Sequence, residues 1–414
     1  NRYLKPHGLF FSPITSTASR AMIGGMVGNN SSGTTSIVYG VTRDKVISLD
    51  TVLSDGNPVK FEALSKDEFE EKTKLQSLEG HIYRKVLEEL SDEEARQEIH
   101  AQFPKKSIHR RNTGYAVDEL LKADLFEGEE KFNFCKLLSG SEGTLAFTTE
   151  IKISLDPLPE PIEIVLAAHF ETIHQSMVAA QTAMKHPATA VELMDKIILD
   201  CTKESIEYSK NRYFVEGDPE AILMVEFRGQ TLEEAMAKGK ALVDDLIATG
   251  LGYAYPIIEP AMVSTAWALR SAGLGLLANI PGDPKAVACI EDTAVDIEDL
   301  ADYIDEVGSM MNGFNQKPVY YAHAGAGEIH LRPILDLKKS EDVEEFYQIS
   351  KASAELVKKY QGSLSGEHGD GRVRAAFIPL MVGEKNYELF RRIKYSWDPQ
   401  NIFNPGKIVD AAPM

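Results

Sequence analysis

The sequence predicts an α+β protein whose second half forms a ferredoxin-like antiparallel sheet. Two observations support this fold class. After residue 160 a strand–helix–strand pattern occurs twice, and the stretch Asp156-Pro157-Leu158-Pro159 separates this part from the preceding one. The expected strands lie at 162–169, near 190, at 221–227 and at 253–258, and the expected helices end at 184 and span 232–248.

Composition narrows the class of protein. The 414 residues allow two or three domains, and 43% apolar residues suffice for buried cores. A net charge of −19 repels phosphate backbones and anionic membrane surfaces, which argues against nucleic acid as a partner. The three dispersed cysteines encode neither a disulfide framework nor a cysteine-bound cluster, and no apolar run reaches the about 18 residues of a membrane span. We expect a cytoplasmic protein, free or at the membrane periphery.

The first part of the chain combines glycine-rich loops, strands and a charged helical segment. Residues 24–40 are rich in glycine and small residues, which predicts a loop. They lead into a strand at 46–53 that the turn Ser54-Asp55-Gly56 closes. The charged segment 65–103 has apolar residues at helical spacing and predicts a helical insertion, with Ser91 as an internal cap. A short helix at 115–125 and a strand at 144–155 follow.

The remaining elements complete the second part. Strands are expected around Tyr320 and Ile329, on either side of a glycine-rich turn. An amphipathic helix at 341–359 leads to another glycine-rich stretch at 362–371. The two β-α-β units predict that helices cover one face of the sheet.

Two glycine-rich segments of the first part are candidates for ligand binding. The segment 24–33 holds four glycines and four small polar residues in ten positions. Such a loop lets backbone N–H groups approach a pyrophosphate or a flavin ring, although it follows neither the G-x-G-x-x-G nor the Walker pattern. Alone, it is explained equally well as a flexible surface turn. The segment 139–144 has the same character just before a strand, and two such loops favour a cofactor.

The run His323-Ala324-Gly325-Ala326-Gly327-Glu328-Ile329-His330 places two histidines seven positions apart around glycines. A tight turn would let both imidazoles converge on one ion, with Glu367 of Gly366-Glu367-His368-Gly369 as a third ligand. For either histidine in isolation, a hydrogen-bonded core residue is the simpler interpretation. Three histidines in glycine-rich settings favour a site, whereas the following are expected to be structural or on the surface: His81, His100, His109, His169, His174 and His186.

Two further polar features have simple structural interpretations. Arg270 is expected to end the apolar helix that contains residues 266–269, where it would reach solvent unless it clamps a carboxylate. The acids Glu291 and Asp292 lie at an expected strand end, and adjacent acids commonly face water.

These motifs together resemble a known family. The first part is similar to the second FAD-binding subdomain of the vanillyl-alcohol-oxidase type, or PCMH-type, flavoproteins. The end of the chain resembles the C-terminal region of FAD-linked oxidases, which include D-lactate, glycolate and D-2-hydroxyglutarate dehydrogenases. The stretches that carry the resemblance are 24–33, 39–44, 112–115, 140–145, 323–330, 365–369 and 398–407.

The resemblance implies an order of domains. Residues 1–157 would form a PCMH-type FAD-binding subdomain, 158–360 a cap or substrate domain, and 361–414 a helical segment that returns to the flavin domain. The family's N-terminal phosphate-binding subdomain is expected to be missing before Asn1. A chain without it would bind FAD weakly, because it loses charge-assisted hydrogen bonds to the pyrophosphate.

The resemblance also assigns roles to residues. His323, His330 and Glu367 would hold a divalent ion, commonly zinc. The adjacent His368 would remove a proton, and Arg270 would bind the substrate carboxylate. The residues expected to contact FAD are Gly24, Gly25, Met26, Gly28, Asn29, Asn30, Ser32, Gly33, Tyr39, Gly40, Gly140, Ser141, Glu142, Gly143, Thr144, Asn404 and Lys407.

One departure from the family concerns the metal loop. Where family members often have Asp and Asn, this chain has Ala326 and Glu328. This variant, with Arg332-Pro333 after it, looks more like the large members that are fused to iron–sulfur modules.

The expected function is oxidation of a D-2-hydroxy acid to a 2-oxo acid, with the hydride passing to flavin N5. A quinone, a flavoprotein or an iron–sulfur module would accept the electrons, since the chain has no G-x-G-x-x-G dinucleotide fingerprint. Two alternatives stay open. One is a metal-dependent hydrolase without flavin that uses His323, His330 and Glu367 to activate water. The other is a noncatalytic fragment of a larger flavoprotein complex.

Overall fold

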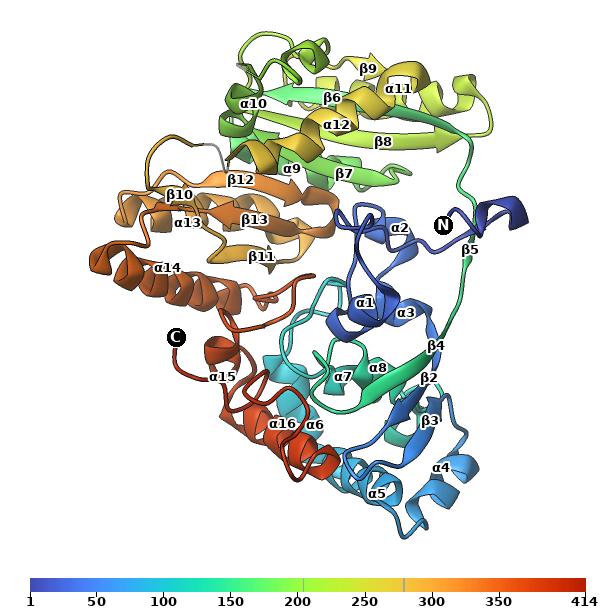
Figure 1. The fold of residues 1–414 in the computed structure, drawn as a ribbon. Helices are drawn as coiled ribbons and strands as arrows, with labels where there is room; N and C mark the ends of the chain where they lie inside the picture. The colour runs from blue at the N-terminus through green and yellow to red at the C-terminus, as the bar shows by residue number, and fades with distance from the viewer. Residues whose placement is uncertain (204, 278–279) are drawn as a thin grey trace. The chain divides into compact units, whose positions relative to one another are not determined.

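The computed structural model describes residues 1–203, 205–277 and 280–414, which form two compact units (Figure 1). The first, called the sheet unit here, comprises Asn1–Ser16, Thr34–Tyr39 and Asp156–Tyr360. The second, called the glycine-loop unit, comprises Thr17–Gly33, Gly40–Leu155 and Gln361–Met414. Among the helices in the described ranges, none has both the length and the apolar character needed to cross a membrane.

The sheet unit is built on one antiparallel sheet of seven strands within the described residues. In sheet order the strands are β11 (Ile290–Ala294), β13 (Glu328–Arg332), β12 (Val319–His323), β7 (Ala190–Asp195), β8 (Ala221–Gly229), β6 (Ile162–Phe170) and β9 (Ile257–Ile258). The part β9-β6-β8-β7 has the strand order of a ferredoxin-like fold, with helices α9 (Ile173–Ala183) and α11 (Leu232–Ala248) as the connections. The predicted ferredoxin-like sheet is therefore confirmed, and β12, β13 and β11 extend it.

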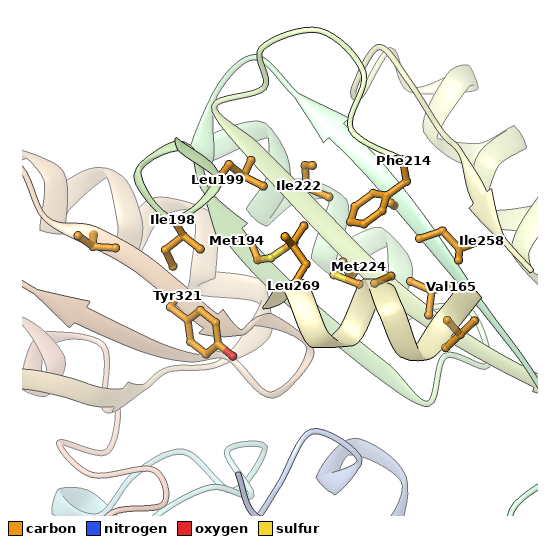
Figure 2. Close-up of a cluster of buried hydrophobic side chains, with 14 of the residues drawn as sticks. Val165, Met194, Ile198, Leu199, Phe214, Ile222, Met224, Ile258, Leu269 and Tyr321 are labelled. Carbon is orange, nitrogen blue, oxygen red and sulfur yellow. The ribbon is translucent and has the colours of Figure 1, made fainter. Parts of the chain in front are cut away.

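Helices cover both faces of this sheet, which corrects the prediction of one covered face. On one face Gly239 of α11 lies against Ile164, where an added Cβ would come within 2.9 Å of the Ile164 Cδ1 atom. On the other face α12 (Pro260–Leu277) contributes Leu269 to an apolar cluster with Val165 and Met224 (Figure 2). The strands are apolar on both sides because both sides are buried.

Tyr321 of β12 lies at the edge of this apolar cluster (Figure 2). Its hydroxyl points away from the apolar side chains, toward the polar part of the same sheet face described below. The remaining elements of the sheet unit are η1 (Lys5–His7), β1 (Leu9–Phe10), α2 (Ser36–Tyr39), β5 (Asp156–Pro157), α10 (Lys196–Lys203), η3 (Ser209–Arg212), β10 (Lys285–Ala286), η4 (Ile297–Asp299), α13 (Leu300–Gly313), η5 (Ala324–Ala326), β14 (Ile334–Leu335) and α14 (Ser340–Lys359).

The glycine-loop unit has a small antiparallel sheet and a helical layer around an aromatic core. The sheet order is β3 (Pro58–Glu62), β2 (Val46–Val52), β4 (Phe147–Ile153), which confirms the predicted strands and the turn between the first two. Phe61 of this sheet lies 5.6 Å from Phe134 and 5.2 Å from Trp397 between ring centroids. These rings join the sheet to the C-terminal helix α16 (Glu384–Trp397).

The predicted helical insertion is confirmed as α4 (Lys66–Thr73), α5 (Leu78–Ser91) and α6 (Glu93–Gln102). The cap of α6 differs from the prediction, because the Asp92 carboxylate and not Ser91 accepts the Glu94 N–H. The other elements of this unit are α1 (Ile23–Asn29), α3 (Thr42–Lys45), α7 (Val117–Leu120), η2 (Asp124–Phe126), α8 (Cys135–Leu138), η6 (Ala375–Phe377) and α15 (Ile378–Val382).

The glycine-rich segment 24–40 is not simply the loop that its composition predicts. Residues 23–29 form α1, although glycine disfavours helix by about 1 kcal/mol per residue. Burial of Met26 and Val27 offsets this cost. The helix ends at Asn30, which has a left-handed conformation with φ 52° and donates its N–H to the carbonyls of Met26 and Val27.

Candidate functional site

The β12–β13 hairpin places three polar side chains on one face of the sheet unit. His323 of β12 is paired in register with Glu328 of β13, and His330 follows two positions later, so all three point to the same side. The hairpin turn needs glycine at position 327, which has φ 68° and where a Cβ would lie 2.0 Å from the carbonyl oxygen of Val295. The glycine-rich turn predicted from the sequence is therefore confirmed, and its glycine has a steric reason.

The two histidines converge. Their ring centroids lie 5.2 Å apart with the ring planes at 81°. His323, Glu328 and His330 each offer a ligand atom, and these atoms lie within 4.8 Å of one another. All three side chains are buried. Two imidazoles and a carboxylate in this arrangement match the donors that a zinc-like divalent ion takes.

Glu192 of β7 holds His323 in one orientation. Both carboxylate oxygens of Glu192 lie 2.9 Å from the His323 Nδ1 atom. Because an ionised carboxylate only accepts hydrogen bonds, Nδ1 carries the proton and Nε2 keeps its lone pair. Carboxylates that fix a histidine in this way are typical partners of metal-ligating histidines.

Arg270 lies inside α12 and is buried, which corrects the prediction that it ends a helix and reaches solvent. Its guanidinium forms an ion pair with Glu192 and donates to the Tyr321 hydroxyl at 2.5 Å and to the Ala322 carbonyl at 3.0 Å. The Cζ atom also lies 3.9 Å from the centroid of the Tyr321 ring. The Nε–H of Arg270 has no acceptor among the residues that the structure describes.

The adjacent acids of β11 are also buried, in contrast to the expectation that they face water. Asp292 has φ 88° and lies at a register shift between β11 and β13, the geometry of a β-bulge. Glu291 is paired with His330 across the strands and accepts from Arg332 at 2.8 and 2.9 Å. Buried strand pairing, and not solvation, therefore determines where these acids lie.

The glycine-loop unit contains a second candidate site at α1. A Cβ added at Gly24, Gly25 or Gly28 would meet no heavy atom of the described residues within 4 Å. None of the three has a left-handed conformation, so the backbone does not require glycine there. An open glycine surface on a helix fits the close approach of a flat ligand. The side chain of Met26, which was also expected to contact FAD, is buried in the protein.

The polar side chains around α1 mostly bond within the protein. Asn30 accepts from the Arg43 N–H at 2.7 Å and donates to Asn112 at 2.8 Å. The Ser141 hydroxyl donates to the Leu138 carbonyl. Any contact of this segment with a ligand would therefore come largely from its backbone.

Glu142 connects two glycine-rich segments of the same unit. It has φ 53°, and one carboxylate oxygen accepts from the N–H groups of Asp370 and Gly371 at 2.6 and 3.1 Å. Its carbonyl accepts from the Asn404 side chain at 2.7 Å. Glu142 thus fixes the backbone that follows Glu367 and His368.

Glu367 is held by residues far away in the sequence. Its carboxylate accepts from the Ser32 hydroxyl at 3.2 Å and lies 3.4 Å from Arg110, a fully buried arginine. The Asn29 side chain donates to the Glu367 carbonyl at 2.6 Å. His368 is more exposed, and its Nε2 lies 3.5 Å from the Glu367 carboxylate.

The structure therefore gathers the predicted residues into two groups. His323 and His330 lie close together, as predicted, and both belong to the sheet unit, as does Arg270. Tyr39 also belongs to that unit, where it packs edge-on against Phe10 at 5.2 Å. The assignment of Glu367 to the ion stays a prediction. The glycine-loop unit contains Glu367, His368, Gly24, Gly25, Met26, Gly28, Asn29, Asn30, Ser32, Gly33, Gly40, Gly140, Ser141, Glu142, Gly143, Thr144, Asn404 and Lys407.

Sequence reasoning missed the residues that hold these groups in place. Glu192 interrupts the apolar residues of β7, and an acidic residue inside a buried strand is the signal that could have identified it. Glu328 lies inside the histidine motif on the same strand face as His330, as the alternation of strand side chains implies. Arg110 and Tyr321 have no comparable sequence signal.

The chain matches two family models and is similar to named dehydrogenases. Residues 159–408 match the family "FAD linked oxidases, C-terminal domain", and residues 1–62 match "FAD binding domain". The chain is 34% identical to a D-2-hydroxyglutarate dehydrogenase of Pseudomonas putida and 33% identical to one of Escherichia coli, in each case over 99% of this chain and 40% of the relative. The chain thus spans about 40% of the length of these curated relatives.

The fold also matches solved structures. It superimposes on p-cresol methylhydroxylase with a TM-score of 0.60 at 12% identity, over 99% of this chain and 73% of that one. This likeness concerns the fold, and it confirms the expected PCMH-type architecture. Since the match to the C-terminal domain covers more than half of the residues, the chain belongs to the FAD-linked oxidase family.

Proposed function

We propose that the chain is the FAD-binding and substrate-binding part of a dehydrogenase that oxidises a D-2-hydroxy acid to a 2-oxo acid. The observation that carries this proposal is the buried pair His323–His330, with Nδ1 of His323 bonded to Glu192. The names of the relatives at 33–34% identity support the class of substrate. We infer further that residues 1–157 and 361–414 serve the flavin and 158–360 the substrate.

The residues that would hold FAD lie around α1 and in the segment 139–144. The open surface at Gly24, Gly25 and Gly28 fits a flat ring or a pyrophosphate, because no side chain stands in the way. When bound, FAD supplies the acceptor for the hydride that leaves the substrate carbon. The protein's own contribution would be backbone contacts and orientation, since most side chains there bond internally.

The residues that would hold a divalent ion are His323, His330 and Glu367. His323 fits this role because Glu192 leaves its Nε2 lone pair for a ligand. A divalent ion would supply Lewis acidity toward the hydroxyl oxygen of the substrate. Around it the protein supplies a buried, preoriented donor set on two paired strands.

Two further residues would act on the substrate itself. His368 is exposed, so its imidazole is accessible to accept the hydroxyl proton. Arg270 would bind the substrate carboxylate through its buried Nε–H, for which the described residues offer no acceptor. Glu192 and Tyr321 hold the guanidinium in place for this contact.

Anaerobic mixing of the FAD-loaded full-length protein with the two enantiomers of a 2-hydroxy acid tests the proposal. We expect the D enantiomer to bleach the flavin absorption and the L enantiomer to leave it unchanged. Electrons should then pass to a quinone, a flavoprotein or an iron–sulfur module, and addition of NAD should give no NADH. A colourless protein that hydrolyses its substrate would support the hydrolase alternative and reject this proposal.

A further inference from the structure

We propose that Glu328 is a protein ligand of the divalent ion, so that one hairpin of the sheet unit supplies three donors. This inference rests on the proposed function, which places an ion at His323 and His330. It goes beyond that function because it gives the chain a carboxylate ligand within the histidine motif itself. It also means that retention of the ion does not depend on Glu367 alone.

The strand register brings the three donors together. His323 and Glu328 are directly opposite in the antiparallel pair, and His330 is the next residue of β13 on the same face. The Glu328 carboxylate lies 3.7 Å from the His330 Nε2 atom. An ion between the three ligand atoms would therefore need small side-chain adjustments and no change of backbone.

The surroundings distinguish Glu328 from the other glutamates near the histidines. Glu192 is paired with Arg270, and Glu291 accepts two hydrogen bonds from Arg332. Each of these two carboxylates lies beside one histidine. Glu328 instead lies within 4.8 Å of donor atoms from both histidines.

Burial gives Glu328 a physical reason to bind a cation. Its side chain is fully buried, at 0% exposure. An ionised carboxylate removed from water is costly unless it is paired or coordinated. Two neutral imidazoles and one carboxylate would together match a His₂Glu donor set, with further positions left for the substrate.

The proposal predicts how the contributions to ion binding are divided. His323, Glu328 and His330 should form the main binding set, and Glu367 should add to it. Glu328→Gln keeps the size of the side chain but removes the charge, so the affinity for a divalent ion should fall at least about tenfold, as with loss of an outer partner of a metal site. Glu367→Gln should have an equal or smaller effect.

Titration of the full-length protein with Co²⁺, followed by its visible absorption and by metal analysis, tests these expectations. Glu226→Gln is the matched control, because Glu226 is also buried on this sheet but is bonded to Arg228 and Thr189 and not to a histidine. The control should bind Co²⁺ like the wild type. Thermal unfolding of each variant shows whether it is folded.

The outcomes separate the inference from the proposed function. If His323→Ala loses Co²⁺ while Glu328→Gln binds it as tightly as the wild type, Glu328 is not a ligand and the proposed function stands. If the wild type binds no Co²⁺, both the ion site of the proposed function and the role of Glu328 as a ligand are rejected. If Glu328→Gln does not fold, Glu328→His decides the question: it supplies another ligand atom and should retain Co²⁺, and a folded Glu328→His variant without Co²⁺ overturns the proposal.

Discussion

The two units position their candidate functional residues in different ways. In the sheet unit His323, Glu328 and His330 lie on paired strands, and the register of the strands decides where they point. In the glycine-loop unit Glu367 lies in a loop, where Ser32, Asn29 and the buried Arg110 hold it. One unit relies on backbone pairing and the other on individual side-chain bonds.

This difference implies different responses to substitution. A sheet can lose one polar side chain and keep its register, because the backbone ladder and the apolar core remain. A loop that depends on single hydrogen-bonding side chains loses its conformation when one of them is removed. We therefore expect substitutions in the sheet unit to affect mainly ligand binding, and substitutions in the glycine-loop unit to affect mainly stability.

The largest expected effect comes from Lys394→Met in the glycine-loop unit. The Lys394 ammonium donates to Asp398 at 2.6 Å, to the Thr144 carbonyl at 2.7 Å and to the Phe403 carbonyl at 2.9 Å. Both members of the ion pair are buried, so removing one should lower the free energy of unfolding by about 3–5 kcal/mol. Urea denaturation measures this change.

A double variant provides the control for Lys394. Lys394→Met with Asp398→Asn removes both charges and should recover part of the loss, because no unpaired charge stays buried. If Lys394→Met alone changes the unfolding free energy by less than about 1 kcal/mol, single side chains do not hold the segment that follows α16, and the comparison of the two units fails.

The next largest effect concerns Glu192 in the sheet unit. Glu192→Gln no longer presents a charged acceptor to His323, so the affinity for a divalent ion should fall about 10–100-fold. The unfolding free energy should also fall, because the buried Arg270 loses its charge partner, although strand pairing between β7 and β8 is unaffected. Calorimetric titration with Zn²⁺ measures the affinity for the ion. An unchanged affinity would show that Glu192 does not support ion binding.

The smallest expected effect is a difference in pH dependence. Burial raises the pKa of Asp195 in the sheet unit to about 7, so its contribution to stability should be lost as the pH rises from about 4 to 7. Burial, together with Arg110, lowers the pKa of His109 in the glycine-loop unit to about 4, so its contribution should be lost as the pH falls from about 6.5 to 4.

Two neutral variants isolate these contributions. Asp195→Asn should be less sensitive to rising pH than the wild type, and His109→Gln less sensitive to falling pH. Urea midpoints between pH 4 and 7 measure both. Parallel curves for the wild type and both variants would mean that neither group titrates as its surroundings imply.

The sequence predicted elements well where local signals agree. Helix α11 lies at 232–248 as expected, because Thr231 caps it and apolar residues recur at helical spacing. The predicted strands at 162–169 and 221–227 are β6 and β8 with small extensions. At the site, the two histidines and their glycine turn also followed from the motif.

Prediction failed where tertiary contacts decide the outcome. Composition alone could not show that burial of Met26 turns a glycine-rich segment into α1. The expected helix at 115–125 is reduced to α7 and η2, and the expected strand at 253–258 to β9 and a bridge between Ala254 and His169. Arg270 was expected in solvent because nothing near it in the sequence indicates the distant Glu192.

We propose that the sheet unit holds the ion and that the glycine surface of α1 holds the flavin. Metal and flavin content of His323→Ala and Gly25→Ala, measured on the full-length protein, tests it most directly. His323→Ala should lose the ion and keep FAD. Gly25→Ala should keep the ion and its stability, because its added Cβ meets no described atom within 4 Å, yet should bind FAD at least about tenfold more weakly. Wild-type FAD binding in Gly25→Ala, or an ion retained by His323→Ala, would contradict the account.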